Sequence, residues 1–363
     1  MSAQATLVFL VVVGARFAVP LFIPLFPLPA IVTALVLDGI DQSVFQWFGY
    51  DPPGYQGYDK AMDMFYLSVA YLSVLRNWTS RPALRVARFL FFYRLVGVVL
   101  FELLDQRWIL LVFPNTFEYF FIAYEIVRLR WDPARVGMRR WVITAACIWI
   151  FVKLPQEWWI HVAQLDFTDT VAANPWITPL LLVLAVIAGL WFWFWLRPRL
   201  PAPAWGRRWA AEPLPAAIDT AAERDSWVAV HGRIFSSATL EKVVLIGLLC
   251  VIYGQVLPGR SSTDLQLFLG IAAFVVVNAA ISLAIARRGG SLDSVLAAFG
   301  ARLVIDVALV VGAGWLLGKA GGGLNVGNAL FFAALLSLLV TLDDRFRPVS
   351  QVRFARSPEP ALP

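Results

Sequence analysis

The chain consists mainly of long apolar segments separated by short stretches that carry charge, glycine or proline. A helix that crosses the hydrocarbon core of a bilayer needs about 20 mostly apolar residues, because the core is about 30 Å thick and a helix rises about 1.5 Å per residue. Segments of roughly this length are predicted to be membrane-spanning helices. They are 61–77, 84–103, 107–127, 140–162, 175–196, 236–257, 265–286, 294–318 and 326–342.

The region 3–48 contains enough apolar sequence for two further helices. Pro20, Pro24, Pro27 and Pro29 lie in the middle of this region. Proline lacks a backbone N–H and its ring clashes with the preceding turn, so the cluster predicts a break between two helices. We therefore expect an all-α, polytopic membrane helix bundle with about eleven spans, or ten if this region forms one span and an interfacial helix.

Composition supports the same fold class. Hydrophobic residues make up 60% of the 363 residues and charged residues only 15%, whereas a soluble domain carries about 25% charged residues. A single water-soluble globule is excluded, and the lipid bilayer is the first expected partner. The excess of 30 Lys and Arg over 24 Asp and Glu is interpreted as a signal of orientation, and no nucleic acid partner is expected.

Basic residues in the short connections predict how the helices are oriented. The connections 76–88 and 128–140 contain nine arginines between them, whereas the intervening connections contain few bases. Such loops stay in the cytoplasm, so these two, together with 197–233, 287–288 and the C-terminus, are predicted to be cytoplasmic. The expected location is the cell (inner) membrane. Arg16 is expected near the cytoplasmic end of the first helix, where its side chain can snorkel to the headgroups.

One long polar connection, rich in proline and alanine, divides the chain into two groups of spans. Its second part has the composition of a short amphipathic helix on the membrane surface. The predicted organisation is a first transmembrane bundle with a polar cavity over 1–197, a cytoplasmic connection over 198–233, a second transmembrane bundle over 234–343 and a cytoplasmic tail over 344–363.

Polar residues inside the predicted spans are the main indication of function. A charged side chain at the bilayer centre costs about 2.5–3.5 kcal/mol on insertion scales, so such residues tend to face a protein interior or a watery cavity. Asp38 and Asp41 share one helix face, and Asp63 and Tyr66 share another. The alternative is structural: either set could lie at a helix end, where acidic residues complement the helix dipole.

Two further spans of the first bundle carry polar groups. Arg94 lies in the middle of an apolar span and needs a partner, for which Asp63 and Glu118 are candidates. Pro114 frees a backbone carbonyl beside Asn115 and Glu118, and a kinked helix with such neighbours is a common way to build a midplane site. The predicted substrate- or ion-binding residues are Asp38, Asp41, Asp63, Tyr66, Arg94, Glu102, Asn115 and Glu118.

The second bundle is poorer in polar groups. Arg302 and Asp306 are one helical turn apart, and we expect them to neutralise each other as a structural pair. The chain has two cysteines and two histidines, and the members of each pair lie far apart in the sequence. Neither a disulfide framework nor a Cys- or His-based metal site is therefore predicted, and no residue is predicted to be a metal ligand.

Three functions are compatible with these features. The first is a transporter or flippase with an outward-facing acidic cavity, in which carboxylates carry protons or cations and Arg94 balances their charge. The second is an intramembrane enzyme acting on a lipid-linked substrate, with a carboxylate as base or metal ligand and Arg94 holding phosphate. The third is a structural or assembly subunit of a membrane complex. A lipid or small-molecule substrate is expected for the first two, and the cofactor is unknown.

Overall fold

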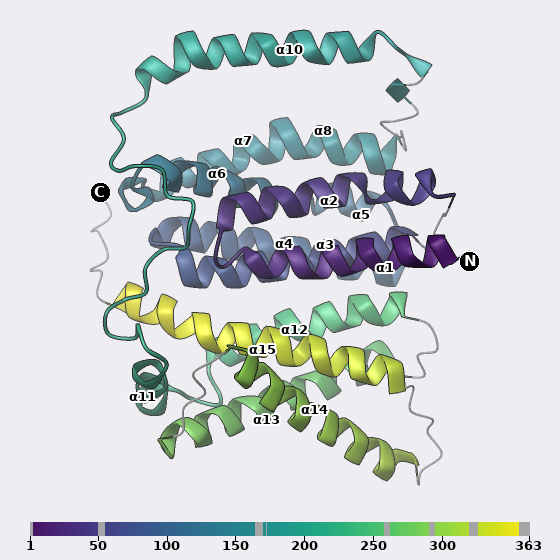
Figure 1. Ribbon diagram of the computed structural model, residues 1–363, viewed down its shortest axis with the longest axis vertical. Coiled ribbons are helices and arrows are strands. Elements are labelled where there is room, and N and C mark those ends of the chain that lie inside the picture. Colours follow the sequence, from purple (N-terminus) through teal and green to yellow (C-terminus); the bar gives the residue numbers. More distant parts are fainter. Residues whose placement is uncertain are drawn as a thin grey trace.

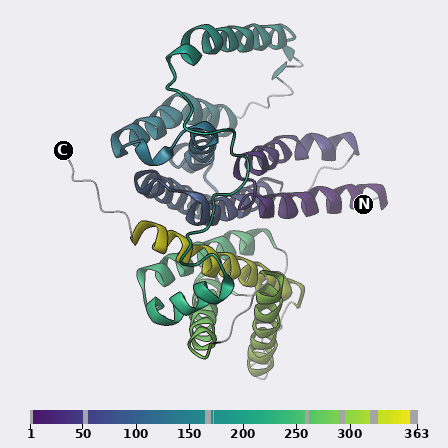
Figure 2. The ribbon, with the colours of Figure 1, turned by 60° about the vertical axis from the view of Figure 1, so that its left-hand side comes forward.

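The computed structural model is all-helical, with 83% helix and no strand among the described residues. The description covers residues 3–49, 55–163, 170–171, 173–257, 262–289, 295–318 and 326–355. Most of the long helices lie side by side, with their axes across the longest dimension of the molecule (Figure 1). A view turned by 60° shows the same stack with the C-terminal helices at one end of it (Figure 2).

The N-terminal region forms two helices, as the prolines predict. Helix α1 (Ala3–Ala18) is followed by the short 3-10 helix η1 (Val19–Phe22) and then by α2 (Pro27–Trp47). Pro20 lies in the first turn of η1 and Pro27 begins α2, positions at which a helix has no partner for the missing N–H. The chain therefore reverses at the proline cluster and α2 packs back against α1.

The next helices carry most of the predicted site residues. They are α3 (Tyr55–Asn77), α4 (Arg81–Leu104), α5 (Trp108–Val112) and α6 (Thr116–Arg130). Pro114 lies between α5 and α6, so the predicted kink is a complete break between two helices. This break leaves backbone groups at the level of the surrounding helices free to meet side chains.

Two irregular helical rods follow. In the first, α7 (Met138–Ile148) and α8 (Leu154–Glu157) are interrupted and extended by π-helical turns, η3 (Trp149–Lys153) and η4 (Trp158–Val162). A π-helical turn changes the direction in which side chains point, and such turns are frequent at functional sites. Here Lys153 and Glu157 are buried although they are charged.

The second rod lies apart from the other helices in Figure 1. It consists of α10 (Ile177–Trp191), the π-helical turn η5 (Phe192–Leu196) and the 3-10 turn η6 (Arg197–Arg199). No residue of its most apolar window is buried inside the protein. A helix with an apolar surface on all sides is suited to contact with lipid.

The C-terminal half contains a short surface helix and four long ones. They are α11 (Ala221–His231), α12 (Ser237–Val256), α13 (Asp264–Arg287), α14 (Val295–Gly318) and α15 (Val326–Ala355). Helices α12 and α15 pack against α3, and one hydrophobic core contains residues from both halves of the chain. The last helix extends well past the predicted end of its span. The domain boundaries given above stay predictions.

The basic connections meet at one end of the helices. Arg353, in the last turn of α15, donates hydrogen bonds to the carbonyls of Arg76, in the last turn of α3, and of Trp78, in the α3–α4 connection. Arg128, near the end of α6, donates to the carbonyl of Ala210 in the long polar connection. This is the arrangement that the prediction of one cytoplasmic side requires, although the side itself stays a prediction.

Six described helical segments are long and apolar enough to cross a membrane, by length and composition, which supports an integral membrane protein; one of them, Trp108–Arg130, comprises α5, the break at Pro114 and α6. Helices α3 and α4, which carry several charged residues, are not among the six, so the predicted number of about eleven spans is not confirmed. The six segments are Pro27–Trp47, Trp108–Arg130, Ile177–Arg199, Ser237–Val256, Asp264–Arg287 and Val326–Ala355.

Candidate functional site

A buried arginine of α1 lies between aspartates of α2 and α3. The Arg16 guanidinium forms ion pairs with Asp38 and Asp41 of α2. Its two terminal nitrogens also lie 3.3 Å from Asp59 and 3.1 Å from Asp63 of α3. Spacings of three and four residues place both aspartates of each helix on the face that looks toward α1.

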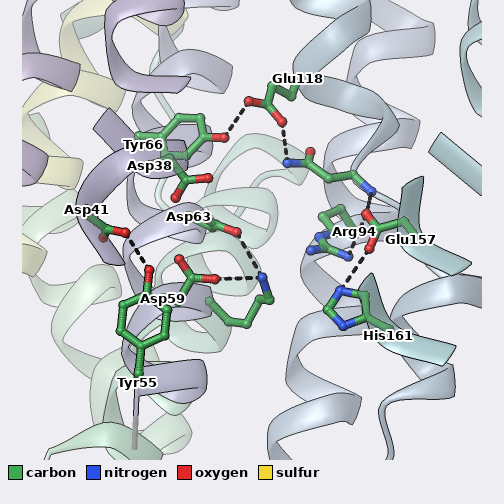
Figure 3. Close-up of polar contacts among 12 residues, drawn as sticks. Asp38, Asp41, Tyr55, Asp59, Asp63, Tyr66, Arg94, Glu118, Glu157 and His161 are labelled. Atoms are coloured by element: carbon green, nitrogen blue, oxygen red, sulfur yellow. Dashed lines mark hydrogen bonds and ion pairs between the residues drawn. The ribbon is translucent and has the colours of Figure 1, made fainter. Parts of the chain in front are cut away.

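Two more side chains from α3 complete this cluster. The Lys60 Nζ lies 2.8 Å from Asp59 and 3.5 Å from Asp63. The Tyr55 hydroxyl donates a hydrogen bond to Asp41 (Figure 3). We refer to these seven residues as the aspartate cluster: Arg16, Asp38, Asp41, Tyr55, Asp59, Lys60 and Asp63.

The position of Arg16 corrects one expectation. Instead of snorkelling toward the cytoplasmic headgroups, its side chain is 3% exposed and is surrounded by carboxylates. Side chains on a helix point toward its N-terminus, which for α1 is the end away from the basic connections. The guanidinium therefore extends back into the bundle, where four carboxylates outweigh the attraction of the headgroups.

The charges of the aspartate cluster do not balance, since it holds four carboxylates and only two basic groups, Arg16 and Lys60. The side chain of Asp41 is 1% exposed, whereas those of Asp38 and Asp59 are 23% and 17% exposed. Asp38, Asp59 and Asp63 each offer an oxygen within 4.8 Å of the other two. Like charges this close repel strongly unless a proton or a cation joins them.

A second group of polar residues surrounds Glu118 at the start of α6. The Tyr66 hydroxyl and the Asn115 amide donate to its two carboxylate oxygens, each over 2.8 Å. The Lys153 Nζ lies 3.6 Å from the same carboxylate and 4.1 Å from the centre of the Tyr119 ring. Tyr66 lies one turn from Asp63 on α3, so this group adjoins the aspartate cluster (Figure 3).

Arg94 contacts a carbonyl and a carboxylate. Its Nη1 donates to the carbonyl of Phe113 over 2.8 Å and lies 3.9 Å from Glu157, whose other oxygen is 3.0 Å from His161. A carboxylate partner for Arg94 is thus present, but it is Glu157 of α8 rather than Asp63 or Glu118. The carbonyl that Arg94 meets is the one at the break before Pro114.

Some buried polar atoms in this part of the protein have no hydrogen-bond partner among the described residues. They are Arg94 Nε, Asn115 Oδ1, Thr116 Oγ1 and Glu102 Oε1. Buried polar groups are normally satisfied, so these atoms are available to a polar substrate or to water. Glu102 faces Gly57 in the first turns of α3, where a Cβ would lie 3.6 Å from its Oε2.

The structure therefore divides the eight predicted residues. Asp38, Asp41 and Asp63 meet in the aspartate cluster, and Tyr66, Asn115 and Glu118 form the second group. Arg94 pairs with Glu157, and Glu102 lies against the start of α3. Whether they bind a substrate or an ion stays a prediction.

Sequence reasoning missed several members of these groups. Arg16 is a charge inside an apolar run, which is a detectable signal. Asp59 lies four residues before Asp63, so the two share one helix face. Lys153 and Glu157 were harder to recognise, because tryptophans beside them fit an interfacial belt. Their burial depends on the π-helical turns, which the local sequence does not predict.

The second half is more polar than expected. Arg302 donates hydrogen bonds to Thr341 and Ser282, both over 2.9 Å, and pairs with Asp344. Asp306 accepts instead from Asn278 over 2.7 Å and from Ser337 over 2.6 Å. The expected mutual neutralisation of Arg302 and Asp306 is thus replaced by contacts across helices, because α13 and α15 offer polar partners that sequence spacing cannot show.

A third ion-pair group joins the two halves of the chain. Glu241 of α12 accepts from Tyr71 of α3 and lies 3.2 Å from Arg347. Lys242 lies 2.9 Å from Asp343, and it also pairs with Asp344. Arg302, and Arg88 with its Nε 3.4 Å from Glu241, also belong to this group, which therefore has four basic residues for three carboxylates, in contrast to the aspartate cluster.

Comparisons with known proteins give no match: no family model, no curated protein and no solved structure is similar to this chain.

Proposed function

We propose that the chain is a cation-coupled membrane transporter in which the aspartate cluster binds the coupling cation, with the proton as the first candidate. The observation that carries this proposal is the charge imbalance of the cluster, four carboxylates against two basic groups. The ion-pair group around Asp343 and Asp344 has no excess of carboxylates and serves as the internal comparison.

The imbalance has a physical consequence. Uncompensated carboxylates are costly inside a protein, because little water is present to solvate them. Two protons, or one divalent cation, would bring the aspartate cluster to neutrality. A site that gains stability by taking up cations, and loses it when they leave, can couple their movement to a change of conformation.

The more exposed residues of the cluster indicate a direction of access. Asp59 lies in the first turns of α3, at the end of the helix opposite Arg76 and the basic connections. Together with Asp38 it is the more exposed part of the cluster. Cations would therefore enter from the side that is predicted to be outside, in agreement with an outward-facing acidic site.

A substrate site can be placed next to this cation site. The unsatisfied Arg94 Nε and Asn115 Oδ1 offer a donor and an acceptor, as a polar group of a small molecule or lipid would need. Tyr66 connects this region to Asp63 through their shared helix. Protonation of the cluster would thus act on α3, and through Tyr66 on the surroundings of Glu118.

A second candidate is an intramembrane enzyme that acts on a lipid-linked substrate. It is favoured by the three carboxylates of Asp38, Asp59 and Asp63, whose oxygens lie within 4.8 Å of one another. Carboxylate oxygens are the ligands that Mg²⁺ and Ca²⁺ prefer. In this case the guanidinium of Arg16 would have to withdraw, and Arg94 would hold a phosphate.

The test measures protonation of the cluster directly. The purified protein in lipid nanodiscs is titrated with acid while infrared spectra are recorded, because a protonated carboxyl and a carboxylate absorb separately. At neutral pH the native protein should show protonated carboxyls that disappear in Asp38→Asn and Asp41→Asn. Asp132→Asn, at a half-buried position between α6 and α7 and outside both polar groups, is the control. Unchanged spectra in both cluster variants would contradict the proposal.

A second measurement separates the two candidates. Mn²⁺ is added to the same samples and bound ion is counted by electron paramagnetic resonance. Tight binding that depends on Asp38, Asp59 and Asp63 supports the enzyme. Proton-dependent uptake of a solute into proteoliposomes, abolished by Asp41→Asn without loss of folded protein, supports the transporter.

A further inference from the structure

A proline-rich segment, 201–218, leads from η6 to α11 without forming a helix. Its prolines lack a backbone N–H and have a fixed φ, so they keep the segment extended and stiff. In Figure 1 it runs past the ends of the helices on its way from the α10 rod to α11. Backbone groups that form no helix need other partners, and those of this segment find them on several helices. We refer to 201–218 as the strap.

Main-chain hydrogen bonds fix the strap to two segments of the first half. The Ala204 N–H donates to the carbonyl of Arg130, at the end of α6, over 2.8 Å. The Ala211 N–H donates to the carbonyl of Leu25, in the turn between η1 and α2, also over 2.8 Å. The strap thus crosses from the end of α6 to the turn that joins the first two long helices.

Glu212 connects the strap to α3 as well. Its N–H donates to Asn77 Oδ1 and its carbonyl accepts from Arg76 Nη1, each over 3.0 Å, in the last turn of α3. Its carboxylate lies 3.6 Å from Arg128 Nη1 of α6. The Asn77 amide also donates to the carbonyl of Pro24 over 3.1 Å. One residue of the strap therefore joins α3, α6 and, through Asn77, the turn before α2.

The far end of the strap is fixed to α15. Arg353 Nη2 donates to the carbonyl of Pro213 over 3.0 Å. Ile218 packs with Val349 and Val352 in a small apolar cluster that is separate from the main core. The strap thereby connects the C-terminal helix to helices of the first half.

These contacts lie at the end of the helices opposite to the proposed cation entrance. The helices that the strap connects carry the aspartate cluster, on α2 and α3, and Glu118, on α6. Most side chains of the strap are exposed. A segment with few buried apolar contacts can open locally while the helices that it holds stay folded.

We propose that the strap is the cytoplasmic gate of the transporter: it holds α3, α6, α15 and the turn before α2 together, and it detaches when this side opens. The inference rests on the proposed function, because a transporter that takes up cations from outside must open its opposite end to release them. Glu212 contacts three segments, so its loss should loosen the strap more than the loss of a residue with one contact.

The test measures access to a buried residue beside the strap. Ser73 is fully buried one turn from Asn77, and its hydroxyl accepts from the Asn77 amide over 3.0 Å. Ser73→Cys places a thiol of similar size at this position. In the full-length protein in lipid nanodiscs, its reaction with a charged maleimide is followed by mass spectrometry. The parent without this substitution gives the contribution of Cys147 and Cys250.

Glu212→Gln should speed this reaction about three- to tenfold, as expected for the loss of one charge-assisted contact. Asp132→Asn is the matched control, because its partner Arg135 is 82% exposed, and it should leave the rate unchanged. Arg208→Gln is a second strap variant: Arg208 lies 3.6 Å from Glu212 and is 43% exposed, so this variant is expected to fold and to have a smaller effect. Unchanged rates in both strap variants, or an equal rise in Asp132→Asn, would overturn the gate.

Hydrogen exchange in the same samples shows where the protein opens. In Glu212→Gln the amides of the strap should exchange faster, while those in the middle of α12 keep the native rate. Faster exchange throughout the chain would mean general destabilisation and would contradict the gate.

A failure of the gate can be told from a failure of the cation site. Glu212→Gln should leave the infrared carboxyl bands of the aspartate cluster unchanged. If the native protein lacks those bands but labelling of Ser73→Cys responds as expected, the cation site is wrong and the strap still closes this end. If the bands are present but labelling does not respond, the cation site stands and the gate is wrong.

Discussion

Replacement of Arg16 by glutamine is the most direct test of the architecture of the first helices. In the structure Asp41 would keep its hydrogen bond from Tyr55, and Asp59 and Asp63 would keep Lys60. The four carboxylates would then share one cation instead of two. Removing one partner of a buried ion pair costs about 3–5 kcal/mol, so Arg16→Gln should lower the free energy of unfolding by at least this amount.

The measurement is unfolding of the protein in mixed micelles with increasing SDS, followed by circular dichroism. The control is Arg135→Gln, which removes an exposed arginine 3.5 Å from Asp132 and should cost less than about 1 kcal/mol. The double variant Arg16→Gln/Asp38→Asn removes one charge of each sign. It should recover part of the loss, because the excess of negative charge returns to that of the native cluster.

The outcome that refutes this reasoning is a small effect. If Arg16→Gln costs no more than the exposed control, the guanidinium lies in water or among lipid headgroups. The convergence of α1, α2 and α3 on one charged centre would then be wrong, and with it the proposed cation site.

The remaining predictions concern packing, helix ends and orientation. Gly97→Ala should destabilise the protein by about 1–3 kcal/mol in the same SDS assay, because a Cβ there would lie 2.1 Å from Phe113 Cβ; Gly270→Ala, where nothing lies within 4 Å, is the control. Thr263→Ala should cost about 1 kcal/mol by removing the cap of α13, while Thr263→Ser should cost less. Green fluorescent protein fused after Ala355 should fluoresce in cells and alkaline phosphatase should be inactive there, and the reverse pattern would overturn the predicted orientation.

Local sequence was sufficient to predict the helices and several of their ends. The predicted break at the N-terminal prolines and the interruption at Pro114 are both present, because proline acts within its own turn and needs no tertiary context. The apolar segments likewise predicted helices of nearly the observed extent, for example Ser237–Val256 for 236–257. The clustering of carboxylates in the first spans was also visible.

The partners of the charged residues could not be predicted in the same way. Arg94 meets Glu157, Arg302 meets Asp344, and Arg16 meets four aspartates, and each of these contacts joins different helices. Sequence spacing reports which residues share a face of one helix, so it favoured the local pair of Arg302 and Asp306.

The sequence by itself determined that this is an all-helical chain built for a membrane, since hydrophobic length and proline position are local properties. Only the tertiary structure decided that α3 lies between α2, α12 and α15. It also decided that the first charged cluster has an excess of negative charge while the one around Asp343 has none. The physical reason is that charge balance belongs to a volume of space, and such a volume collects residues from helices whose packing no single segment specifies.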